Sequence, residues 1–149
     1  MVFFVYINVQ TNNNKTMEKI TVTLTVSKEF SHEEINDLVS CALEGGINYW
    51  CKRVIPMQYK IGNDFFGVAE VDQDKIEFIS DVISYGGSLK LYDAESTDVW
   101  ILDLEKLLKG IKMYCEHNHI TPDNMMKNYD ANTADIIVQY ALFNEQVFC

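Results

Sequence analysis

The chain of 149 residues is 48% hydrophobic and 12% aromatic, so it can bury the core of one compact domain. Twenty-two acidic residues against twelve basic ones give a formal net charge of −10, and Arg53 is the only arginine. Because affinity for nucleic acid rests on lysines and arginines that neutralise phosphates, direct binding to DNA or RNA is not expected. Such a charge either keeps a cytoplasmic protein soluble or lets its surface imitate nucleic acid.

The beginning of the chain is apolar, and we expect it to be neither a targeting signal nor a membrane span. Residues 1–10, MVFFVYINVQ, are too few to span a bilayer, and they have neither a basic region before them nor a cleavage site after them. The polar stretch at residues 10–16 separates this start from Met17. We therefore expect residues 1–16 to be an N-terminal extension and residues 17–149 to form a single α+β domain with no membrane partner.

The first part of this domain predicts a strand followed by a helix. ITVTLTV at residues 20–26 alternates apolar residues with threonine, the period-two pattern of a strand with one buried face. Ser31 and Glu34 have the spacing of a capping box, and apolar residues recur behind them at helical spacing until two glycines end the pattern. A helix is therefore expected over residues 32–44.

The middle of the chain predicts two further strands and a second helix. INYWCKRVI, which begins at Ile47, is rich in β-branched and aromatic residues, and Pro56 is expected to end this strand. Residues 65–71 predict the next strand. Asp72 is placed to cap a helix that carries apolar residues on one face and ends at a second pair of glycines.

The last part of the chain predicts a hairpin and two helices. Residues 88–92 and 98–102 are expected to pair across a polar loop. Helical spacing predicts a helix over residues 104–115, and after a polar link Asn132 with Asp135 opens a last helix. Because strands and helices mix without a regular βαβ rhythm, we expect an α+β fold with an antiparallel or mixed sheet of about four to five strands and about four helices.

The first two predicted helices both end at a Gly-Gly pair that leads into a strand. A glycine just after a helix accepts a positive φ without a clash, and a second glycine lets a ligand or another backbone approach closely. Beside these pairs lie an amide, aromatic faces suited to a planar base, and basic side chains suited to phosphate. The predicted ligand-binding residues are Gly45, Gly46, Asn48, Tyr49, Trp50, Lys52, Arg53, Tyr85, Gly86, Gly87 and Lys90.

The stretch after the first glycine pair has a structural alternative. If residues 47–55 form a strand, Tyr49 and Cys51 face away from Trp50, and these side chains cannot all line one pocket. Trp50 would then pack as core beneath the helices, and the ligand site would lie elsewhere.

No metal site or cofactor is expected. Cys115, His117 and His119 lie two residues apart, but side chains with this spacing diverge at the end of a helix, and the paired spacings of zinc ligands are missing. Without CxxC pairs or a secretory context, the cysteines are expected to be reduced thiols of a cytosolic protein. They are Cys41, Cys51, Cys115 and Cys149.

No catalytic residues are predicted either. A run of carboxylates without a base is expected to be a solvated hairpin loop and the start of a helix, where negative charge is stabilising. The run comprises Asp93, Glu95, Asp98, Asp103 and Glu105. Motifs of P-loops, dinucleotide-binding folds and hydrolases are absent, so the sequence favours a protein that is not an enzyme.

Four strings in the sequence resemble one family of proteins. ALEGGINYWC, GGSLKLYDAES, LLKGIKMY and IVQYALF are similar to a family of small hypothetical proteins from phages, prophages and mobile elements of anaerobic Firmicutes, over residues 18–149. The resemblance implies a cytoplasmic accessory or counter-defence factor of an infected or lysogenic bacterial host. It brings no particular ligand, activity or catalytic residue.

Two hypotheses follow for the function. The first is a non-catalytic, oligomeric protein that sequesters a nucleotide-derived immune signal at the glycine-rich turns. The second is an acidic interaction protein that inhibits a host defence enzyme by imitating nucleic acid with Asp93, Glu95 and Asp98. A metal-dependent hydrolase is less favoured. The apolar C-terminal QVFC and the first strand predict a homo-oligomer, since sheet edges commonly pair between subunits.

Overall fold

The computed structural model describes residues 26–61, 64–67 and 78–149. The chain divides into two units, Met1–Phe30 and Ser31–Cys149. The predicted N-terminal extension and nearly all of the first predicted strand lie outside the described residues. The elements that follow belong to the second unit.

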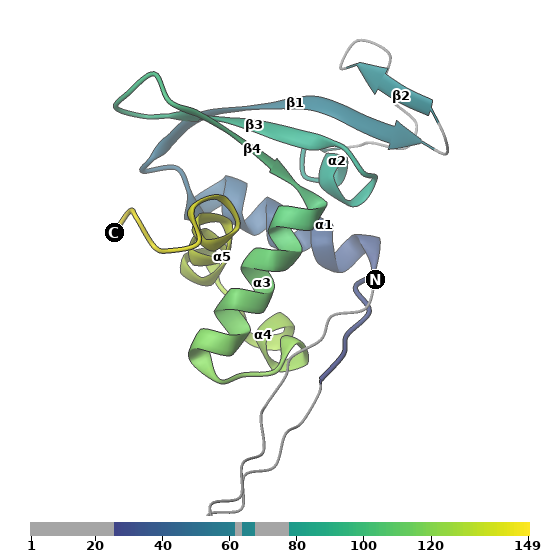
Figure 1. The fold of residues 1–149 in the computed structure, drawn as a ribbon, viewed down its shortest axis with the longest axis vertical. Helices are drawn as coiled ribbons and strands as arrows, with labels where there is room; N and C mark the ends of the chain where they lie inside the picture. The colour runs from purple at the N-terminus through teal and green to yellow at the C-terminus, as the bar shows by residue number, and fades with distance from the viewer. Residues whose placement is uncertain (1–25, 62–63, 68–77) are drawn as a thin grey trace, which may run out of the picture. The chain divides into compact units, whose positions relative to one another are not determined.

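Four strands form one antiparallel sheet with the order β2-β1-β3-β4. They are β1 (Cys51–Ile61), β2 (Asp64–Gly67), β3 (Ser88–Asp93) and β4 (Val99–Asp103). The helices of this unit lie on one side of the sheet (Figure 1). The prediction of an α+β fold is therefore confirmed, and in the described residues every strand pairing is antiparallel.

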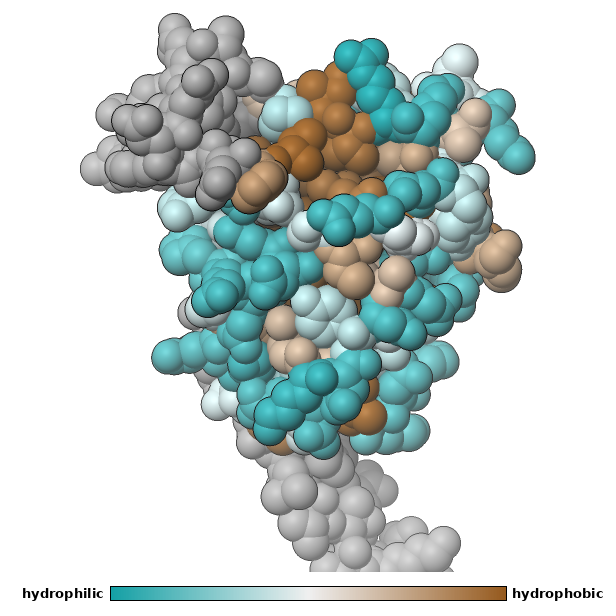
Figure 2. Space-filling model, turned by 180° about the vertical axis from the view of Figure 1, so that it is seen from behind, coloured by the Kyte–Doolittle hydropathy of each residue, from teal (hydrophilic) through white to brown (hydrophobic). Residues whose placement is uncertain are grey.

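The two faces of β3 differ in burial. Leu89 and Leu91 have no exposed surface, and they alternate with the partly exposed Lys90 and Tyr92. This period-two pattern directs the leucines toward the helices. Within the described part of the chain, no helix covers the other face of the sheet (Figure 1). Figure 2, a view from behind, shows hydrophobic residues gathered near the top, at the height of the sheet in Figure 1. Met57 and Val99 are exposed hydrophobic residues of these strands.

The prediction that Pro56 ends its strand is wrong, because β1 continues to Ile61. Pro56 pairs with Leu89, and the register shifts between Pro56 and Gln58. Proline donates no backbone hydrogen bond, so a strand tolerates it where the ladder is already interrupted by a bulge.

The first predicted helix divides into two segments. α1 (His32–Cys41) begins with the predicted capping box of Ser31 and Glu34, and a π-helical turn, η1 (Ala42–Gly46), continues it. Among the glycines that the structure describes, Gly86, which follows α2, has a positive φ of 87°. The predicted positive φ is thus confirmed at the second glycine pair and wrong at the first, where both glycines belong to the π-helical turn.

A turn replaces the start of the predicted second strand. The amide of Cys51 donates to the carbonyl of Ile47 at 2.8 Å, and β1 begins only at Cys51. The prediction of a strand from Ile47 is therefore wrong over its first four residues. The alternation argument that separated Tyr49 from Trp50 does not apply in this turn.

The second predicted helix is short in the structure. α2 covers Asp81–Ser84, and residues 78–80 form a bend and a turn, so the prediction that the helix already includes Ile79 is wrong. The predicted cap, Asp72, lies outside the described residues. A hydrogen bond from the amide of Phe78 to the side chain of Asp81, at 3.0 Å, stabilises this helix start.

Three helices complete the unit: α3 (Leu104–Asn118), α4 (Pro122–Asn128) and α5 (Ala131–Phe143). Each has a side-chain N-cap, from Asp103, Thr121 and Asp130 respectively. The prediction of a polar link between α3 and α5 is wrong at α4, because Pro122 occupies the first turn of a helix, where its missing N–H is harmless.

α3 and α5 pack closely against each other. A Cβ atom added at Gly110 of α3 would overlap the backbone carbonyl of Ile137 in α5. Ile111 and Ile137 have no exposed surface. The glycine therefore allows the two backbones to approach, and α5 is held firmly enough to present fixed side chains toward the turn before β1.

Candidate functional site

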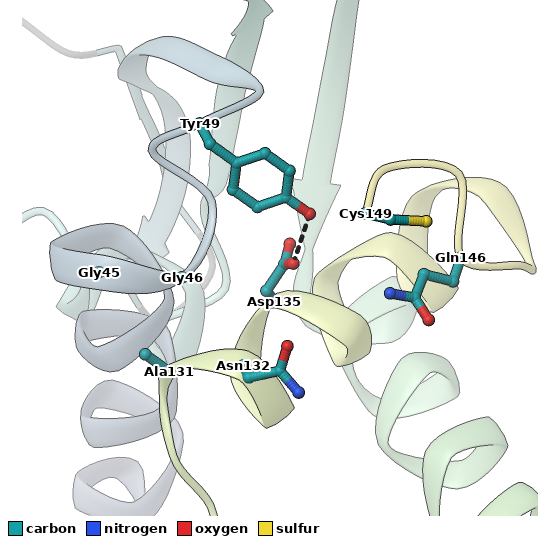
Figure 3. Close-up of a pocket in the computed structure, with 8 residues that line it drawn as sticks. All are labelled: Gly45, Gly46, Tyr49, Ala131, Asn132, Asp135, Gln146 and Cys149. Atoms are coloured by element: carbon teal, nitrogen blue, oxygen red, sulfur yellow. Dashed lines mark hydrogen bonds between the residues drawn. The ribbon is translucent and has the colours of Figure 1, made fainter.

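The carboxylate of Asp135 is the centre of a hydrogen-bond network between α5 and the turn before β1. Asp135 is only 3% exposed. The hydroxyl of Tyr49 donates to its Oδ2 at 2.8 Å, and the indole N–H of Trp50 donates to its Oδ1 at 2.7 Å. Because the backbone turns at residues 47–50, two consecutive side chains reach the same carboxylate (Figure 3 shows the Tyr49 bond).

Gln139 extends this network to the C-terminal segment. It lies one helical turn after Asp135, has no exposed surface, and donates through Nε2 to both carboxylate oxygens at 3.0 Å. Its Oε1 accepts from the backbone amides of Val147 and Phe148 at 2.8 and 2.7 Å. One buried amide thus fixes both the carboxylate and the backbone after α5.

A pocket of about 550 Å³ opens beside this network (Figure 3). The π-helical turn, the turn after it, the first two turns of α5 and the C-terminal segment supply its wall. Tyr49 is 52% exposed, so the pocket presents an aromatic side chain to solvent, whereas Asp135, which meets the hydroxyl of Tyr49 (Figure 3), is almost fully buried. The lining residues are Gly45, Gly46, Tyr49, Ala131, Asn132, Asp135, Gln146 and Cys149.

The phenol of Tyr49 is held in its protonated form. Burial, and then the hydrogen bond to Asp135, raise the pKa of Tyr49 from its ordinary value of 10.0 to about 12. The residues that line the pocket include no lysine, arginine or histidine. The pocket therefore offers a neutral aromatic ring, two side-chain amides, the carboxyl group of Asp135 and the thiol of Cys149, without a positively charged side chain.

The two glycines of the first pair have different roles. A Cβ atom at Gly46 would lie 2.7 Å from the backbone oxygen of Ala131, whereas one at Gly45 would make only an ordinary contact of 3.6 Å with the Cβ of Ala131. Gly46 is therefore required for the close approach of η1 to the start of α5. The predicted role of the second glycine, close approach of another backbone, matches this geometry.

The structure brings together part of the predicted ligand-binding set. Gly45, Gly46 and Tyr49 line the pocket, and Trp50 supports it from behind, being 2% exposed. Asn48 points elsewhere, since its side-chain amide donates to the carbonyl of Glu44 at 2.9 Å. The burial of Trp50 supports the structural alternative, in which its ring is part of the core. The expectation that the ligand site would then lie elsewhere does not follow, because Gly45, Gly46 and Tyr49 still line a pocket at this turn.

The other predicted residues lie away from the pocket. Arg53 and Lys90 both lie over the ring of Tyr92, with their charged groups 5.7 and 5.2 Å from its centroid. The ammonium of Lys52 donates to the carbonyl of Ser96. Tyr85 stacks on His32, with ring centroids 4.8 Å apart, and is followed by Gly86 and Gly87 between α2 and β3.

Several site residues were not predicted. Asn132 and Asp135 were noted only as the opening of a helix, whereas Asp130 caps α5 and Asp135 lies in its second turn. A usable signal was the spacing of Asp135 and Gln139, two polar residues four apart in the apolar part of the helix. Gln146 and Cys149 carry no comparable signal, because their place at the pocket depends on the path of the backbone after α5.

Three of the residues that were considered for metal binding or catalysis have structural roles. Among the described residues, no group of three or more His, Cys, Asp or Glu side chains could hold a metal ion. Cys115 is buried, which raises its pKa to about 12. Asp93 accepts a hydrogen bond from the amide of Ser96 at 2.7 Å, and its pKa is lowered chiefly by hydrogen bonding to Ser96. Asp103 caps α3.

No helix within the described ranges combines the length and the hydropathy that crossing a bilayer requires. Comparison of the chain with known protein families, with curated proteins and with solved structures found no match. The interpretation of the site therefore rests on its own residues.

Proposed function

We propose that the chain is a non-catalytic binding protein whose pocket holds a nucleotide-derived small molecule. The observation that carries this proposal is the lining of the pocket. It combines an exposed tyrosine ring, two side-chain amides and the backbone of two glycines. Its volume, about 550 Å³, lies within the range usual for small-molecule sites. An aromatic face with amide donors and acceptors suits the flat, hydrogen-bonding ring of a base.

The geometry favours binding over catalysis. Both oxygens of Asp135 already accept hydrogen bonds, from Tyr49, Trp50 and Gln139, so this carboxylate is occupied as a structural acceptor. The hydroxyl of Tyr49 is engaged in the same network. The lining holds one thiol, that of Cys149, but no histidine, and its carboxylate is already occupied, so no free general base lies there to activate a nucleophile.

The biological role that we propose is sequestration of a nucleotide-derived immune signal in the cytoplasm of a bacterial host. The resemblance to phage and mobile-element proteins supports this role, and sequestration needs tight binding but no turnover. The alternative, imitation of nucleic acid, has less support. Asp93, one of the three carboxylates that this alternative uses, is only 8% exposed and so presents little of its charge to a partner.

Native mass spectrometry of the purified protein tests the proposal, using a panel of cyclic nucleotides and ADP-ribose derivatives. We expect one compound to be retained at a fixed ratio and recovered chemically intact after denaturation, and the same spectra give the predicted oligomeric state. Recovery of a converted product would show an enzyme instead. Absence of binding across the panel would overturn the proposal, and capture of a defined host enzyme would then favour nucleic-acid mimicry.

Two matched variants locate the binding site. Asn132→Ala removes an amide from the pocket wall, and we expect about tenfold weaker binding, the effect of one lost hydrogen bond. Asn124→Ala is the control, since Asn124 is also an exposed asparagine in the first turn of a helix but lies outside the pocket lining. Equal loss of binding in both variants would place the site elsewhere.

A further inference from the structure

The carboxylate of Asp135 lies at the pocket without a cationic partner in the described part of the chain. Its polar contacts there are hydrogen bonds from Tyr49, Trp50 and Gln139, all of them neutral donors. Neutral donors stabilise a buried carboxylate but leave its negative charge in place. The charge of Asp135 therefore acts on whatever occupies the pocket, through a medium that screens it less than bulk water.

The ring of Tyr49 adds to this preference for positive charge. Its hydroxyl donates to Asp135, which fixes the orientation of the side chain beside the pocket (Figure 3). The pKa of about 12 keeps the phenol neutral, and the face of a neutral aromatic ring attracts cations. A planar cation that stacks on this face would gain from both the ring and the nearby carboxylate.

The start of α5 does not reverse the sign of the pocket. Its first residues, Ala131 and Asn132, line the pocket, and a helix N-terminus alone favours anions. Asp130 caps this end, however, and its carboxylate accepts from the amide of Thr133 at 2.8 Å. Hydrogen bonding to Thr133 lowers the pKa of Asp130, so a negative charge already offsets the helix dipole there. A phosphate would find no lysine, arginine or histidine in the lining.

The amides of Asn132 and Gln146 complete the recognition chemistry. Each offers a carbonyl acceptor and an NH₂ donor, the pair of groups that a carboxamide on the ligand would match. We infer that the pocket takes a planar, positively charged ring bearing a carboxamide, a pyridinium of the nicotinamide type, with any phosphates of the ligand outside the pocket. This inference rests on the proposed function and names the chemical class of its ligand.

Three ring compounds of nearly equal size test the inference by isothermal titration calorimetry with the full chain. 1-Methylnicotinamide is a cation, nicotinamide is neutral and nicotinate is an anion. We expect affinity to fall in that order, by about tenfold between the cation and the neutral ring, with the advantage of the cation shrinking as salt is added. Equal affinities or the reverse order would overturn the inference.

A matched pair of variants ties the preference to the pocket. Tyr49→Leu removes the ring that faces the ligand and should abolish most of the advantage of the cation. Tyr92→Leu removes a tyrosine whose ring contacts Arg53 and Lys90 outside the pocket lining, and it should leave the order of affinities unchanged. Loss of the cation's advantage in both variants would overturn the assignment to this pocket.

The outcomes separate the inference from the proposed function. If the three rings fail to bind but a compound of the nucleotide panel is retained, the inference is wrong and the proposed function stands. If neither series binds, both are wrong. If the cation binds most tightly among the rings and a nicotinamide-bearing dinucleotide added to the panel is retained, both are supported by independent measurements.

Discussion

Trp50 and Phe148 stack face to face, with ring centroids 5.0 Å apart and planes inclined by only 5°. This contact joins the turn before β1 to the segment after α5, which are also linked through Gln139 and Asp135. Trp100 and Phe143 pack edge-on against both rings. The wall of the pocket that carries Gln146 and Cys149 therefore depends on an aromatic cluster that lies beside it.

Replacing Phe148 with alanine should destabilise the fold. We expect Phe148→Ala to lower the free energy of unfolding by about 2 kcal/mol, less than for a fully buried phenylalanine because Phe148 is half-buried. Urea unfolding followed by tryptophan fluorescence measures the change. Val147→Ala is the control: its side chain is 50% exposed, and its effect should stay within about 0.5 kcal/mol. Similar losses in both variants would mean that the stacking contributes little.

The glycine pair of η1 gives a second matched comparison. Gly46→Ala should lower the free energy of unfolding by about 1 to 3 kcal/mol, because its Cβ would lie 2.7 Å from the backbone oxygen of Ala131 and the helices would have to separate. Gly45→Ala meets only an ordinary contact of 3.6 Å and should be neutral or stabilising by up to about 1 kcal/mol. Thermal unfolding of the two variants distinguishes them, and equal effects would contradict the different roles of the glycines.

Local signals in the sequence predicted much of the fold. The capping box of Ser31 and Glu34 acts within four residues of chain, so its spacing alone indicated the helix start. Asp103 was expected near a helix N-terminus because of its charge, and the structure shows that it caps α3. The helix that begins at Pro122 was not predicted, because proline both breaks helices and begins them. The cap from Thr121 decides between these two roles, and only local backbone geometry shows that it forms.

The candidate site was only partly predictable, for a physical reason. The hydrogen bond from Tyr49 to Asp135 joins residues 86 apart in the sequence, and no local pattern sets that pairing. The turn at residues 47–50 was also hidden by the β-branched and aromatic composition of the stretch, which favours a strand. Tertiary contacts of the buried Trp50 override that preference, so two side chains expected on opposite faces meet at one carboxylate.

The raised pKa of Tyr49 predicts a dependence of stability on pH. Since the folded-state pKa of about 12 exceeds the ordinary value of 10.0, the contribution of this group is fully present below pH 10 and is lost as the pH rises toward 12. The wild-type chain should therefore lose more stability over this interval than Tyr49→Phe, which carries no hydroxyl. Urea midpoints at several alkaline pH values test this difference.

A spectroscopic titration provides the check on that assignment. The tyrosinate absorbance of the wild-type chain minus that of Tyr49→Phe should show one group that ionises above the ordinary tyrosine range. If the tyrosine that the variant lacks ionises near pH 10, Tyr49 is not held by Asp135 in solution, and the hydrogen-bond network at the pocket is weaker than the structure shows.

The thiols should differ in reactivity according to their burial. Cys149 is exposed at the pocket, whereas Cys51 and Cys115 are buried and burial raises the pKa of each. Because the thiolate is the reactive form, the native chain should show one fast thiol toward a disulfide reagent, and Cys149→Ser should remove it. Cys41, which is partly exposed and has a raised pKa, should react more slowly.

Protection of this thiol then reports occupancy of the pocket. A compound that fills the pocket should slow the modification of Cys149 at the concentrations at which it binds, and it should leave the slower reaction of Cys41, outside the lining, unchanged. Kinetics of modification with and without 1-methylnicotinamide measure both rates in one experiment. Binding without protection of Cys149 would show that the ring is held somewhere other than between Tyr49 and the C-terminal segment.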